Sequence, residues 1–410
     1  MRRMIHLWHI SIMSLAGFSA ASLTFWLVAI FRIARTMLSV PTARAARALR
    51  PRVAADESVC VVIPAHNESL VIEKLVASLL RQDHASVHFV LALDRCTDDT
   101  AAKARALIRD DPRFTIVEIA SCPDDWAGKV NAIHSAVTRI EHARRADVLI
   151  FADADTTFAP DCVGTTLRLM NHRKLDLLSL VSTLTFGHWF EKLLQPAAGV
   201  ELMKQFPLTR AAKATGRRPF ANGQFIMIRR AAYEKIGGHH AVHDELLEDL
   251  AIARLAAGHD VPAGVFLADT VLYCSMYPAY PAFRRGWKRI YTESANRRPE
   301  RLRQWGWRCR AISTLLPLCT LVFSLLAAFS WPEEWSSRQA PAMALAFTAL
   351  GVYMLAAAFI YRLGHAPLWT LPGYPIGSWM VGGILIEAAR DLDEDKPIIW
   401  GGREYKRERR

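Results

Sequence analysis

Apolar segments near both ends constrain the fold of this chain more than any other feature. Ile5 to Phe31 is an apolar run that only two histidines interrupt, and it exceeds the ~20 residues that a spanning helix needs. A secretory signal peptide has a shorter apolar region of roughly 7 to 15 residues, so we expect an uncleaved anchor. Ala311 to Trp331 and Pro341 to Tyr361 are two more apolar segments joined by a short charged loop. They predict a membrane hairpin.

Positive charge gathers beside these segments. Arg2 and Arg3 precede the first one, six arginines follow it between residues 32 and 52, and ten lysines or arginines lie between Arg284 and Arg310. The positive-inside rule therefore predicts that the region between the first and second segments is cytosolic, in a multi-pass protein of the inner (cytoplasmic) membrane. Charge beside membrane segments also explains the net charge of +12 better than nucleic-acid binding does, so no nucleic-acid partner is expected.

The seven cysteines are scattered and never spaced C-x-x-C. This pattern excludes an obvious zinc site and fits reduced thiols in the cytosol. His239, His240 and His243 are close in sequence, but no clear pattern supplies further ligands. We interpret them as part of a polar loop rather than a metal site.

Short β-type runs alternate with helical patterns in the middle of the chain. The strands are expected at residues 59–63, 88–93, 115–119, 148–151 and 225–228, and the helices at 69–81, 100–108 and 245–257, the last capped by Asp244. This alternation favours a mostly parallel sheet covered by helices, an α/β fold. We therefore expect an anchor and linker at 1–52, a cytosolic α/β domain at 53–275, an amphipathic interface region at 276–310, and C-terminal membrane helices with a cytosolic tail at 311–410.

Two carboxylates, Asp153 and Asp155, follow the apolar run from Val148 to Phe151. A strand ending there would hold both acids at the carboxyl edge of the sheet, where open α/β sheets bind ligands. Paired oxygen ligands suit Mg²⁺ or Mn²⁺, and such an ion is usually also coordinated by substrate phosphates. A solvated, Asp-rich turn is the alternative for an isolated D-x-D.

Other motifs accompany the D-x-D in a fixed order. They are Pro64-Ala65-His66-Asn67-Glu68, Asp94 before Cys96-Thr97-Asp98-Asp99-Thr100, Gly128-Lys129, Asn222-Gly223-Gln224 and Glu248-Asp249. The ordered set resembles the family 2 glycosyltransferases, whose catalytic domain has the GT-A fold, a Rossmann-like α/β architecture.

The resemblance implies a role for each motif. Asp94 and Asp153 would contact the uracil and ribose of a nucleotide sugar, Asp155 with Asp153 would hold Mg²⁺ or Mn²⁺, and Asp249 would be the catalytic base. It implies donor binding by Pro64, Glu68, Asp94, Lys129, Asp153, Asn222, Gly223, Gln224, Glu248, Trp287 and Arg403. The simpler alternatives are a surface acid for Asp249, a solvated lysine for Lys129 and a plain turn at Asn222.

These roles agree with the chemistry of sugar transfer. The reaction builds negative charge on the leaving phosphate, which a divalent ion stabilises directly. An acceptor hydroxyl is a weak nucleophile, and a positioned carboxylate accelerates its attack typically 10² to 10⁴-fold by taking its proton. One acid cluster therefore serves the leaving group and a separate acid serves the nucleophile.

Phe283, Trp287 and Tyr291 recur at four-residue spacing with cations between them. This periodicity is typical of an amphipathic helix in the bilayer interface, and equally of a helix that docks its aromatic face on the domain. The Q-x-x-R-W segment of processive polysaccharide synthases is absent here, because Arg284-Arg285-Gly286-Trp287 occupies its place.

The overall layout and the terminal Trp400-Gly401-Gly402-Arg403-Glu404-Tyr405 resemble the lipid-modifying members of the family, such as carotenoid-ester, hopanoid-associated and ceramide glucosyltransferases. The resemblance implies transfer of one sugar to a membrane lipid. Residues 366–389 contain several Pro and Gly and are expected to be re-entrant or interfacial, which would keep Arg403 near the donor diphosphate. A polyprenyl-phosphate glycosyltransferase, a processive synthase and a non-enzymatic scaffold remain alternatives.

Overall fold

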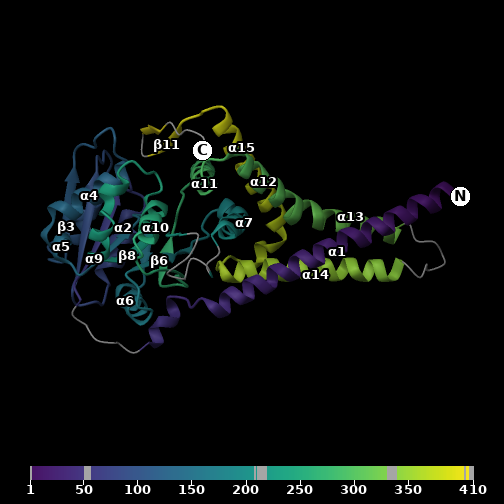
Figure 1. Cartoon of the computed structure of the whole chain (residues 1–410), viewed down its shortest axis with the longest axis horizontal. Coiled ribbons are helices and arrows are strands. Elements are labelled where there is room, and N and C mark those ends of the chain that lie inside the picture. The colour runs from purple at the N-terminus through teal and green to yellow at the C-terminus, as the bar shows by residue number, and fades with distance from the viewer. Residues whose placement is uncertain are drawn as a thin grey trace.

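An α/β domain and a group of long apolar helices make up the protein. The computed structural model describes residues 2–49, 57–206, 209, 219–329, 339–400 and 403–405. The α/β domain lies at one end, and the long helices α1, α13 and α14 run away from it to the other, where the N-terminus lies (Figure 1). In the view of Figure 1 the C-terminal strands appear toward the end of the molecule that holds the α/β domain.

Seven strands form the main sheet in the order β3, β2, β1, β4, β8, β6, β9. Neighbours are parallel except for β8, which is antiparallel to both β4 and β6. The strands are β1 (Val59–Ala65), β2 (Val87–Asp94), β3 (Phe114–Ile119), β4 (Val148–Ala152), β6 (Leu177–Val181), β8 (Phe225–Arg229) and β9 (Ala263–Leu267). The predicted α/β fold class is confirmed, and the five predicted strands each coincide with an observed strand to within two residues at either end.

Helices cover both faces of this sheet, which is why its central strands are apolar at every position. In β1, Val59, Val61 and Ile63 contribute to one core and Cys60 and Val62 to the other, as the two-residue period of a strand requires. The first core is covered by α2 (Ile72–Leu80), α3 (Thr100–Ile108) and α6 (Cys162–His172), and the second by α4 (Gly128–Arg139), α5 (Glu141–Arg145), α9 (Arg230–Lys235) and α10 (Glu248–Gly258).

The start of α10 differs from the prediction. A helix was expected from Glu245 with Asp244 as its cap, but α10 begins at Glu248 after Leu247, and no side chain caps it. The segment before it makes a turn, in which the N–H of Glu245 donates to the carbonyl of Val242. The later start places Glu248 and Asp249 in the first helical turn, where the helix dipole favours negative charge.

Smaller elements complete the domain. A three-stranded sheet pairs β5 (Thr156–Phe158), β10 (Leu272–Cys274) and β7 (Thr183–Leu184), and the hairpin of β11 (Ile398–Trp400) and β12 (Arg403–Tyr405) lies near the C-terminus. The 3-10 helix η2 spans Gly238–Val242.

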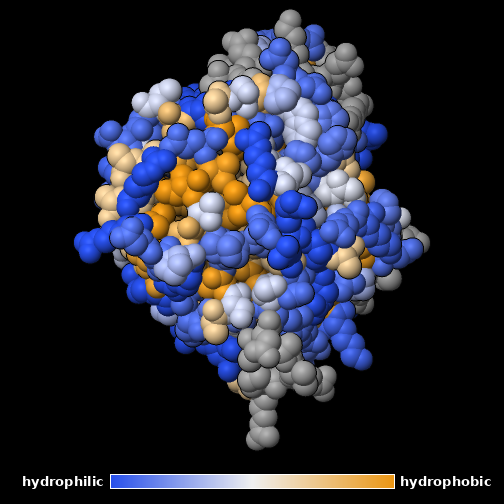
Figure 2. Space-filling view, turned by 90° about the vertical axis from the view of Figure 1, so that its left-hand side faces the viewer, coloured by the Kyte–Doolittle hydropathy of each residue, from blue (hydrophilic) through white to orange (hydrophobic). Residues whose placement is uncertain are grey.

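Figure 2 shows the end of the domain turned away from the long helices, where hydrophilic residues surround a group of apolar ones. The edge strand β3 is only half-buried.

Three helical segments within the described ranges are long and apolar enough to cross a membrane: Ile10–Ala48, Pro299–Ala328 and Gln339–Leu363. The first contains most of α1 (Arg2–Ser39) and continues past its end to residue 48. The second runs from α12 (Pro299–Arg310) through the π-helical turn η3 (Ala311–Leu315) into α13 (Leu316–Phe329), and the third is α14 (Gln339–Leu363). The three predicted apolar segments are therefore helices, although the loop predicted to join the last two lies outside the described residues.

A third core joins these helices to the α/β domain. It is formed by α7 (Trp189–Gln205), α11 (Tyr280–Ser294), α12, α14 and α15 (Tyr374–Asp393), which the 3-10 helix η4 (Leu368–Gly373) precedes. The aromatic stripe Phe283, Trp287 and Tyr291 of α11 is at most 3% exposed within this core. Of the two interpretations of that stripe, docking on protein describes the structure, and insertion of the stripe into a bilayer interface does not.

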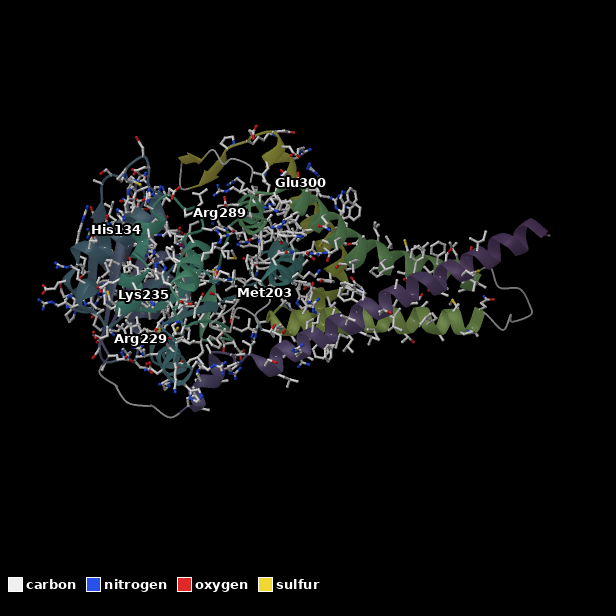
Figure 3. All side chains as sticks on the ribbon, viewed as in Figure 1. His134, Met203, Arg229, Lys235, Arg289 and Glu300 are labelled. Carbon is white, nitrogen blue, oxygen red and sulfur yellow. The ribbon has the colours of Figure 1, made fainter. Side chains whose placement is uncertain are left out.

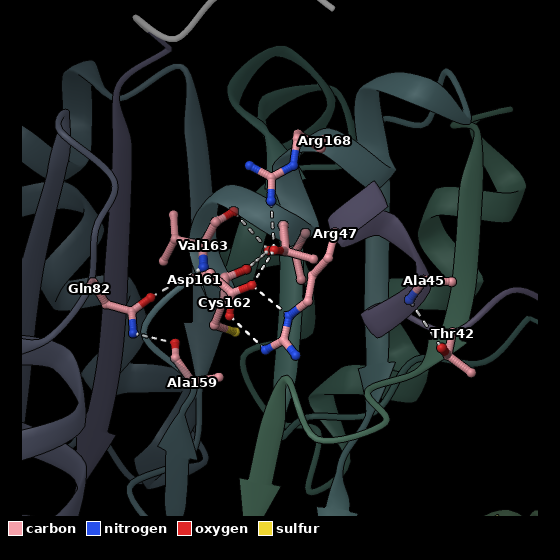
Figure 4. A network of polar contacts seen from close by, with 11 residues as sticks. Thr42, Ala45, Arg47, Gln82, Ala159, Asp161, Cys162, Val163 and Arg168 are labelled. Atoms are coloured by element: carbon pink, nitrogen blue, oxygen red, sulfur yellow. Dashed lines mark hydrogen bonds and ion pairs between the residues drawn. The ribbon is translucent and has the colours of Figure 1, made fainter. Parts of the chain in front are cut away.

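The segment after α1 is docked on the α/β domain. It contains the 3-10 helix η1 (Arg44–Ala48), whose Arg47 donates hydrogen bonds of 2.6 and 2.8 Å to the Asp161 carboxylate at the start of α6 (Figure 4). Just before η1, the Thr42 hydroxyl donates to Asp269 (3.0 Å), and the N–H of Ala43 donates to the carbonyl of Leu267 (2.8 Å). The predicted linker is thus a fixed attachment as far as residue 49.

Candidate active site

One cavity of about 1610 Å³ contains every predicted site residue except Arg403 along its wall. It begins at the carboxyl ends of β1, β2 and β4 and continues between α1, α7 and α14. Arg403 belongs to β12, and its side chain lies outside the described part of the chain. Motifs separated by as many as 223 residues, from Pro64 to Trp287, therefore share one site.

The loops after β1 and β2 are tied together. The Asn67 side chain accepts a hydrogen bond from the N–H of Thr97 (2.8 Å), and Asp98 accepts one from the N–H of Ser69 (3.1 Å). The N–H of Glu68 donates to the Thr100 hydroxyl (2.8 Å). Asn67 has a φ of 56°, a conformation that asparagine tolerates better than most residues. These bonds connect the N-E turn to the T-D-x-T segment and hold the backbone of Glu68 in place.

Asp94, at the end of β2, is buried and forms a two-point ion pair with Arg95. The Arg95 guanidinium donates to the two carboxylate oxygens at 2.8 and 2.7 Å, and its backbone φ is 48°. Gly128, at the start of α4, packs against this pair, because a Cβ there would lie 2.8 Å from Arg95 and 3.0 Å from Asp94. Reasoning from the sequence singled out Asp94 but missed Arg95.

Acidic side chains crowd the end of β4. The carbonyl of Asp153 accepts hydrogen bonds from the N–H (3.3 Å) and the hydroxyl (2.7 Å) of Thr156, which forms a tight turn after the strand. Burial, together with Asp153 and Glu68, raises the pKa of Asp155 well above its usual value. Burial, Asp153 and Asp98 raise the pKa of Glu68 to about 7. These two carboxyls are therefore more easily protonated than solvated ones, and a bound cation would favour their ionised forms.

Lys129, the second residue of α4, links the D-x-D to the Glu248-Asp249 motif. Its ammonium group lies 2.6 Å from Asp153 and 2.5 Å from Glu248. Burial lowers its pKa, but the two carboxylates outweigh that effect, so the net pKa shift is upward and the lysine stays charged. The alternative of a solvated lysine does not describe this residue.

Asp249 is held by backbone donors at the start of α10. Its Oδ2 accepts from the N–H of Gly223 (2.7 Å) and its Oδ1 from the N–H of Leu250 (2.7 Å). Burial and the neighbouring Glu248 raise its pKa to about 6, against the lowering effect of Lys129 and the two N–H donors. A carboxyl with such a pKa is ionised near neutral pH yet basic enough to accept a proton, as a general base must be.

The Asn222-Gly223-Gln224 turn forms the wall beside these charges. The Ser179 hydroxyl accepts from the N–H of Asn222 (2.8 Å), and the Asn222 side chain donates to the carbonyl of Leu180 (2.9 Å) and to Gln224 (2.9 Å). A Cβ on Gly223 would lie 3.1 to 3.3 Å from the charged atoms of Lys129, Asp249 and Glu248. A glycine lets the backbone approach all three closely, whereas any larger residue would require these side chains to shift.

The acid cluster fits a divalent cation. Asp155 Oδ1 is buried and has no hydrogen-bond partner among the described residues, whereas the same carboxylate accepts a bond from the Cys274 thiol. A hard oxygen without a partner beside two other carboxyl groups is the donor set that Mg²⁺ and Mn²⁺ prefer. No cluster of three or more ligating side chains is complete within the described ranges, so substrate oxygens would have to supply the remaining ligands.

Most of the rest of the cavity was not predicted, and its wall combines apolar residues with basic ones. Its wall includes Trp287 and Arg289 of α11, Met203 of α7, and apolar residues of the long helices: Phe25, Trp26, Ala29, Ile33, Phe359, Ile360 and Leu363. Arg289 and Met203 lie between the sheet and the long helices (Figure 3). The Trp287 indole N–H is buried without a partner among the described residues. No short motif marks these apolar positions, because apolar residues serve equally in a core or a membrane helix.

A family model matches part of the chain, and several solved structures are similar to it at low identity. Residues 60–237 match the sequence model of the family described as glycosyl transferase family 2. No curated protein matches the chain significantly. Among solved structures, the chain is similar to the mannosyltransferase PcManGT from Pyrobaculum calidifontis, in complex with GDP-Man and Mn²⁺, with 18% identity, a TM-score of 0.49, and coverage of 93% of this chain and 99% of that one.

Two further solved structures are similar at lower scores. S. aureus TarS 1-349 in complex with UDP-GlcNAc has 13% identity and a TM-score of 0.41, covering 85% of this chain and 96% of that one. Glucosyl-3-phosphoglycerate synthase from Mycobacterium tuberculosis has 16% identity and a TM-score of 0.39, covering 60% and 85%. The match at 60–237 includes the PxxNE turn, the D-x-D and the Asn222-Gly223-Gln224 turn. The chain therefore contains a glycosyl transferase family 2 domain with the GT-A fold and is a glycosyltransferase.

Proposed function

We propose that this enzyme is bound to the inner membrane and transfers one sugar, with inversion, from a nucleotide-diphosphate sugar to a membrane lipid. The donor is expected to be a UDP-sugar, and the acceptor group a hydroxyl or carboxyl of a carotenoid, hopanoid or sphingolipid type of lipid. The observation that carries this proposal is the continuity of the cavity, which joins the carboxylates at the sheet edge to apolar residues of α1 and α14. A water-soluble acceptor would not need that apolar half.

The donor half of the cavity supports a nucleotide diphosphate. Asp153 and Asp155 would hold Mg²⁺ or Mn²⁺ together with the diphosphate, and the ion would supply positive charge where the leaving phosphate becomes negative. Lys129 adds a fixed cation beside Asp153, and Asp94 lies at the edge where the base of the nucleotide would bind. The proposed metal ligands and nucleotide contacts rest on this arrangement and on the family resemblance.

The acceptor half supports a lipid that enters from the membrane side. Apolar residues of the candidate spans α1 and α14 line this end, and Val200 and Met203 of α7 line the same cavity. Burying an acyl or terpenoid chain there gains roughly 0.8 kcal/mol per CH₂ group. Asp249, held by Gly223 and Leu250, would take the proton of the acceptor hydroxyl. Because one base acts in a single displacement, the configuration of the anomeric carbon would invert.

One observation favours an isoprenoid phosphate as a second candidate acceptor. Arg32 of α1 and Arg362 of α14 line the cavity, and neither has an acidic partner among the described residues. Two such cations could bind the phosphate of a polyprenyl phosphate. With a neutral acceptor lipid, only the headgroups of the bilayer would be available to pair with these arginines.

The decisive experiment is incubation of the purified protein with labelled UDP- and GDP-sugars and a native lipid extract. A labelled lipid whose sugar has the inverted configuration at the anomeric carbon would support the proposal, and its mass would identify the acceptor. Label in a polyprenyl phosphate alone would favour the second candidate. Label in a polymer formed from donor alone would instead indicate a processive synthase and contradict both.

A further inference from the structure

A second hollow, separate from the candidate active site, lies where the α/β domain meets the long helices. It has a volume of about 440 Å³ and is bounded by α11, the end of α12 and α15. Its wall contains three arginines, Arg284, Arg310 and Arg390, together with Glu387 and the aromatic residues Tyr280 and Trp379. None of these residues lines the active-site cavity.

Arg310 is held in this hollow by two tryptophan rings and a backbone carbonyl. Its guanidinium carbon lies 4.4 Å from the centre of the Trp379 ring and 5.4 Å from that of Trp307, and its Nε donates to the carbonyl of Trp379 (3.2 Å). Cβ atoms on Gly382 and Gly383 would lie 2.7 and 2.8 Å from Arg310 atoms. Two consecutive glycines in α15 therefore leave the space that this side chain occupies.

The charge balance of the hollow is positive. The Glu387 carboxylate is already contacted by Arg284 (2.5 Å) and Lys288 (3.1 Å), and Lys288 also pairs with Asp391. Arg310 and the exposed Arg390 have no acidic partner among the described residues. Three arginines thus face one carboxylate in the wall of the hollow, and two of them, Arg310 and Arg390, retain guanidinium donors suited to the oxygens of a phosphate.

The position of the hollow indicates the kind of anion. Arg310 is the last residue of α12, directly before the apolar stretch that continues into α13. Trp307 (54% exposed), Trp379 (39%) and Ile376 (59%) surround it on the outside of the protein. Exposed tryptophans beside cations are typical of the headgroup level of a bilayer, where amphipathic rings and basic residues meet anionic lipid.

From these observations we propose that the hollow between α11, α12 and α15 binds the phosphate group of an anionic phospholipid, with Arg310 and Arg390 as its main ligands and Trp307 and Trp379 against the glycerol and upper acyl chains. This site is distinct from acceptor binding and does not depend on which lipid is glycosylated. A soluble phosphate shares the same chemistry, so the experiment must separate the two sources.

Binding is measured with the full chain reconstituted in phosphatidylcholine vesicles with or without phosphatidylglycerol, by counting the phosphatidylglycerol that remains bound after detergent extraction. We expect the Arg390→Gln variant to lose about fivefold in apparent affinity for phosphatidylglycerol, the scale of one juxtamembrane charge, and Arg310→Gln to lose at least as much. Arg390 is exposed, so its variant tests the site even if Arg310→Gln fails to fold.

The matched control is Arg285→Gln, which removes an exposed arginine from α11 outside the hollow. Retained phosphatidylglycerol binding in Arg285→Gln together with loss in Arg390→Gln supports a defined site. Equal loss in both would mean general surface electrostatics and would overturn the proposal. Displacement of bound phosphatidylglycerol by inorganic phosphate at comparable concentration would assign the hollow to a soluble anion and would equally overturn it.

Discussion

The backbone N–H of Gly223 donates a hydrogen bond of 2.7 Å to the carboxylate of Asp249, 26 residues later in the chain. This bond joins the turn that lines the donor half of the cavity to the side chain assigned as the base. It also restricts which Asp249 oxygen lone pairs remain free for an acceptor proton.

Asp249→Asn is expected to lower kcat by about 10² or more, because an amide cannot accept the acceptor proton. Asparagine keeps only one acceptor oxygen and so loses one of the two bonds from Gly223 and Leu250, but the acid cluster keeps its charges. Donor affinity measured by calorimetry should therefore stay within a few-fold of the parent. Asp244→Asn, an exposed acid in the loop before α10, is the control. Near-parental turnover in Asp249→Asn would move the role of base to another residue.

Gly223→Ala is expected to reduce turnover while leaving the melting temperature nearly unchanged. The added Cβ would lie within 3.3 Å of Lys129, Asp249 and Glu248, so these side chains must move. Their movement would misalign the proposed base with the bound substrates. Gly258→Ala is the matched control, because nothing lies within 4 Å of its Cβ position. Parental turnover in Gly223→Ala would show that the close approach has no catalytic role.

The acceptor kcat/KM, measured at saturating donor and metal, is expected to rise with pH and to level off above about pH 6. The reason is that Asp249 acts as a base only when ionised, and burial with Glu248 raises its pKa to about 6. Glu248→Gln removes the repelling charge and should shift the rise to lower pH. Lys129→Met removes the attracting charge and should shift it to higher pH. Shifts in the opposite directions would exclude Asp249 as the titrating base.

Chelation of divalent cations is expected to abolish donor binding, and added Mn²⁺ or Mg²⁺ should restore it. Asp155→Asn should weaken donor binding at any practical metal concentration, because Asp155 carries the buried oxygen without a partner. Donor binding is measured by calorimetry with the full chain in detergent. Asp161→Asn, whose carboxylate pairs with Arg47 away from the cavity, controls for loss of an acid elsewhere. Undiminished binding in excess chelator would remove the metal from the proposal.

Gly199→Leu is expected to raise the acceptor KM about tenfold or more without changing donor affinity. Gly199 lies on α7 along the apolar half of the cavity, and nothing lies within 4 Å of its Cβ position, so leucine would occupy acceptor space. Gly351→Leu places the same side chain in equally open surroundings on α14, outside the cavity. If both variants had the same acceptor KM, the apolar half would not be the acceptor path.

Much of the donor half could be predicted from the sequence, because its residues follow strands and form short, ordered motifs. The side chains of β1 alternate between the two cores, and the end of this strand places Pro64 at the carboxyl edge of the sheet. The D-x-D directly follows β4 and therefore lies at the same edge. The boundary of α10 was harder to predict, since Asp244 is a good capping residue in isolation, yet tertiary contacts delay the helix to Glu248.

The acceptor half could not be predicted in the same way. Its wall combines residues from α1, α7 and α14, such as Phe25, Met203 and Ile360, and helix packing across more than 300 residues has no local signature. The aromatic stripe of α11 shows the same limit, because the four-residue period fits burial against protein and against lipid equally well. In the structure the stripe is buried in a core with residues of α7 and α15, so it packs against protein.

The attachment of η1 to α6 and to the loop after β9 has a consequence for acceptor choice. Arg47 with Asp161, and Thr42 with Asp269, hold the end of α1 against the catalytic domain, so in the proposed membrane setting Asp249 would stay at a constant height above the hydrocarbon. The enzyme would then select acceptors by the distance between their reacting hydroxyl and the hydrocarbon surface. A lipid whose hydroxyl lies at the height of Asp249 would react, and a lipid whose hydroxyl lies nearer to or farther from the hydrocarbon would not.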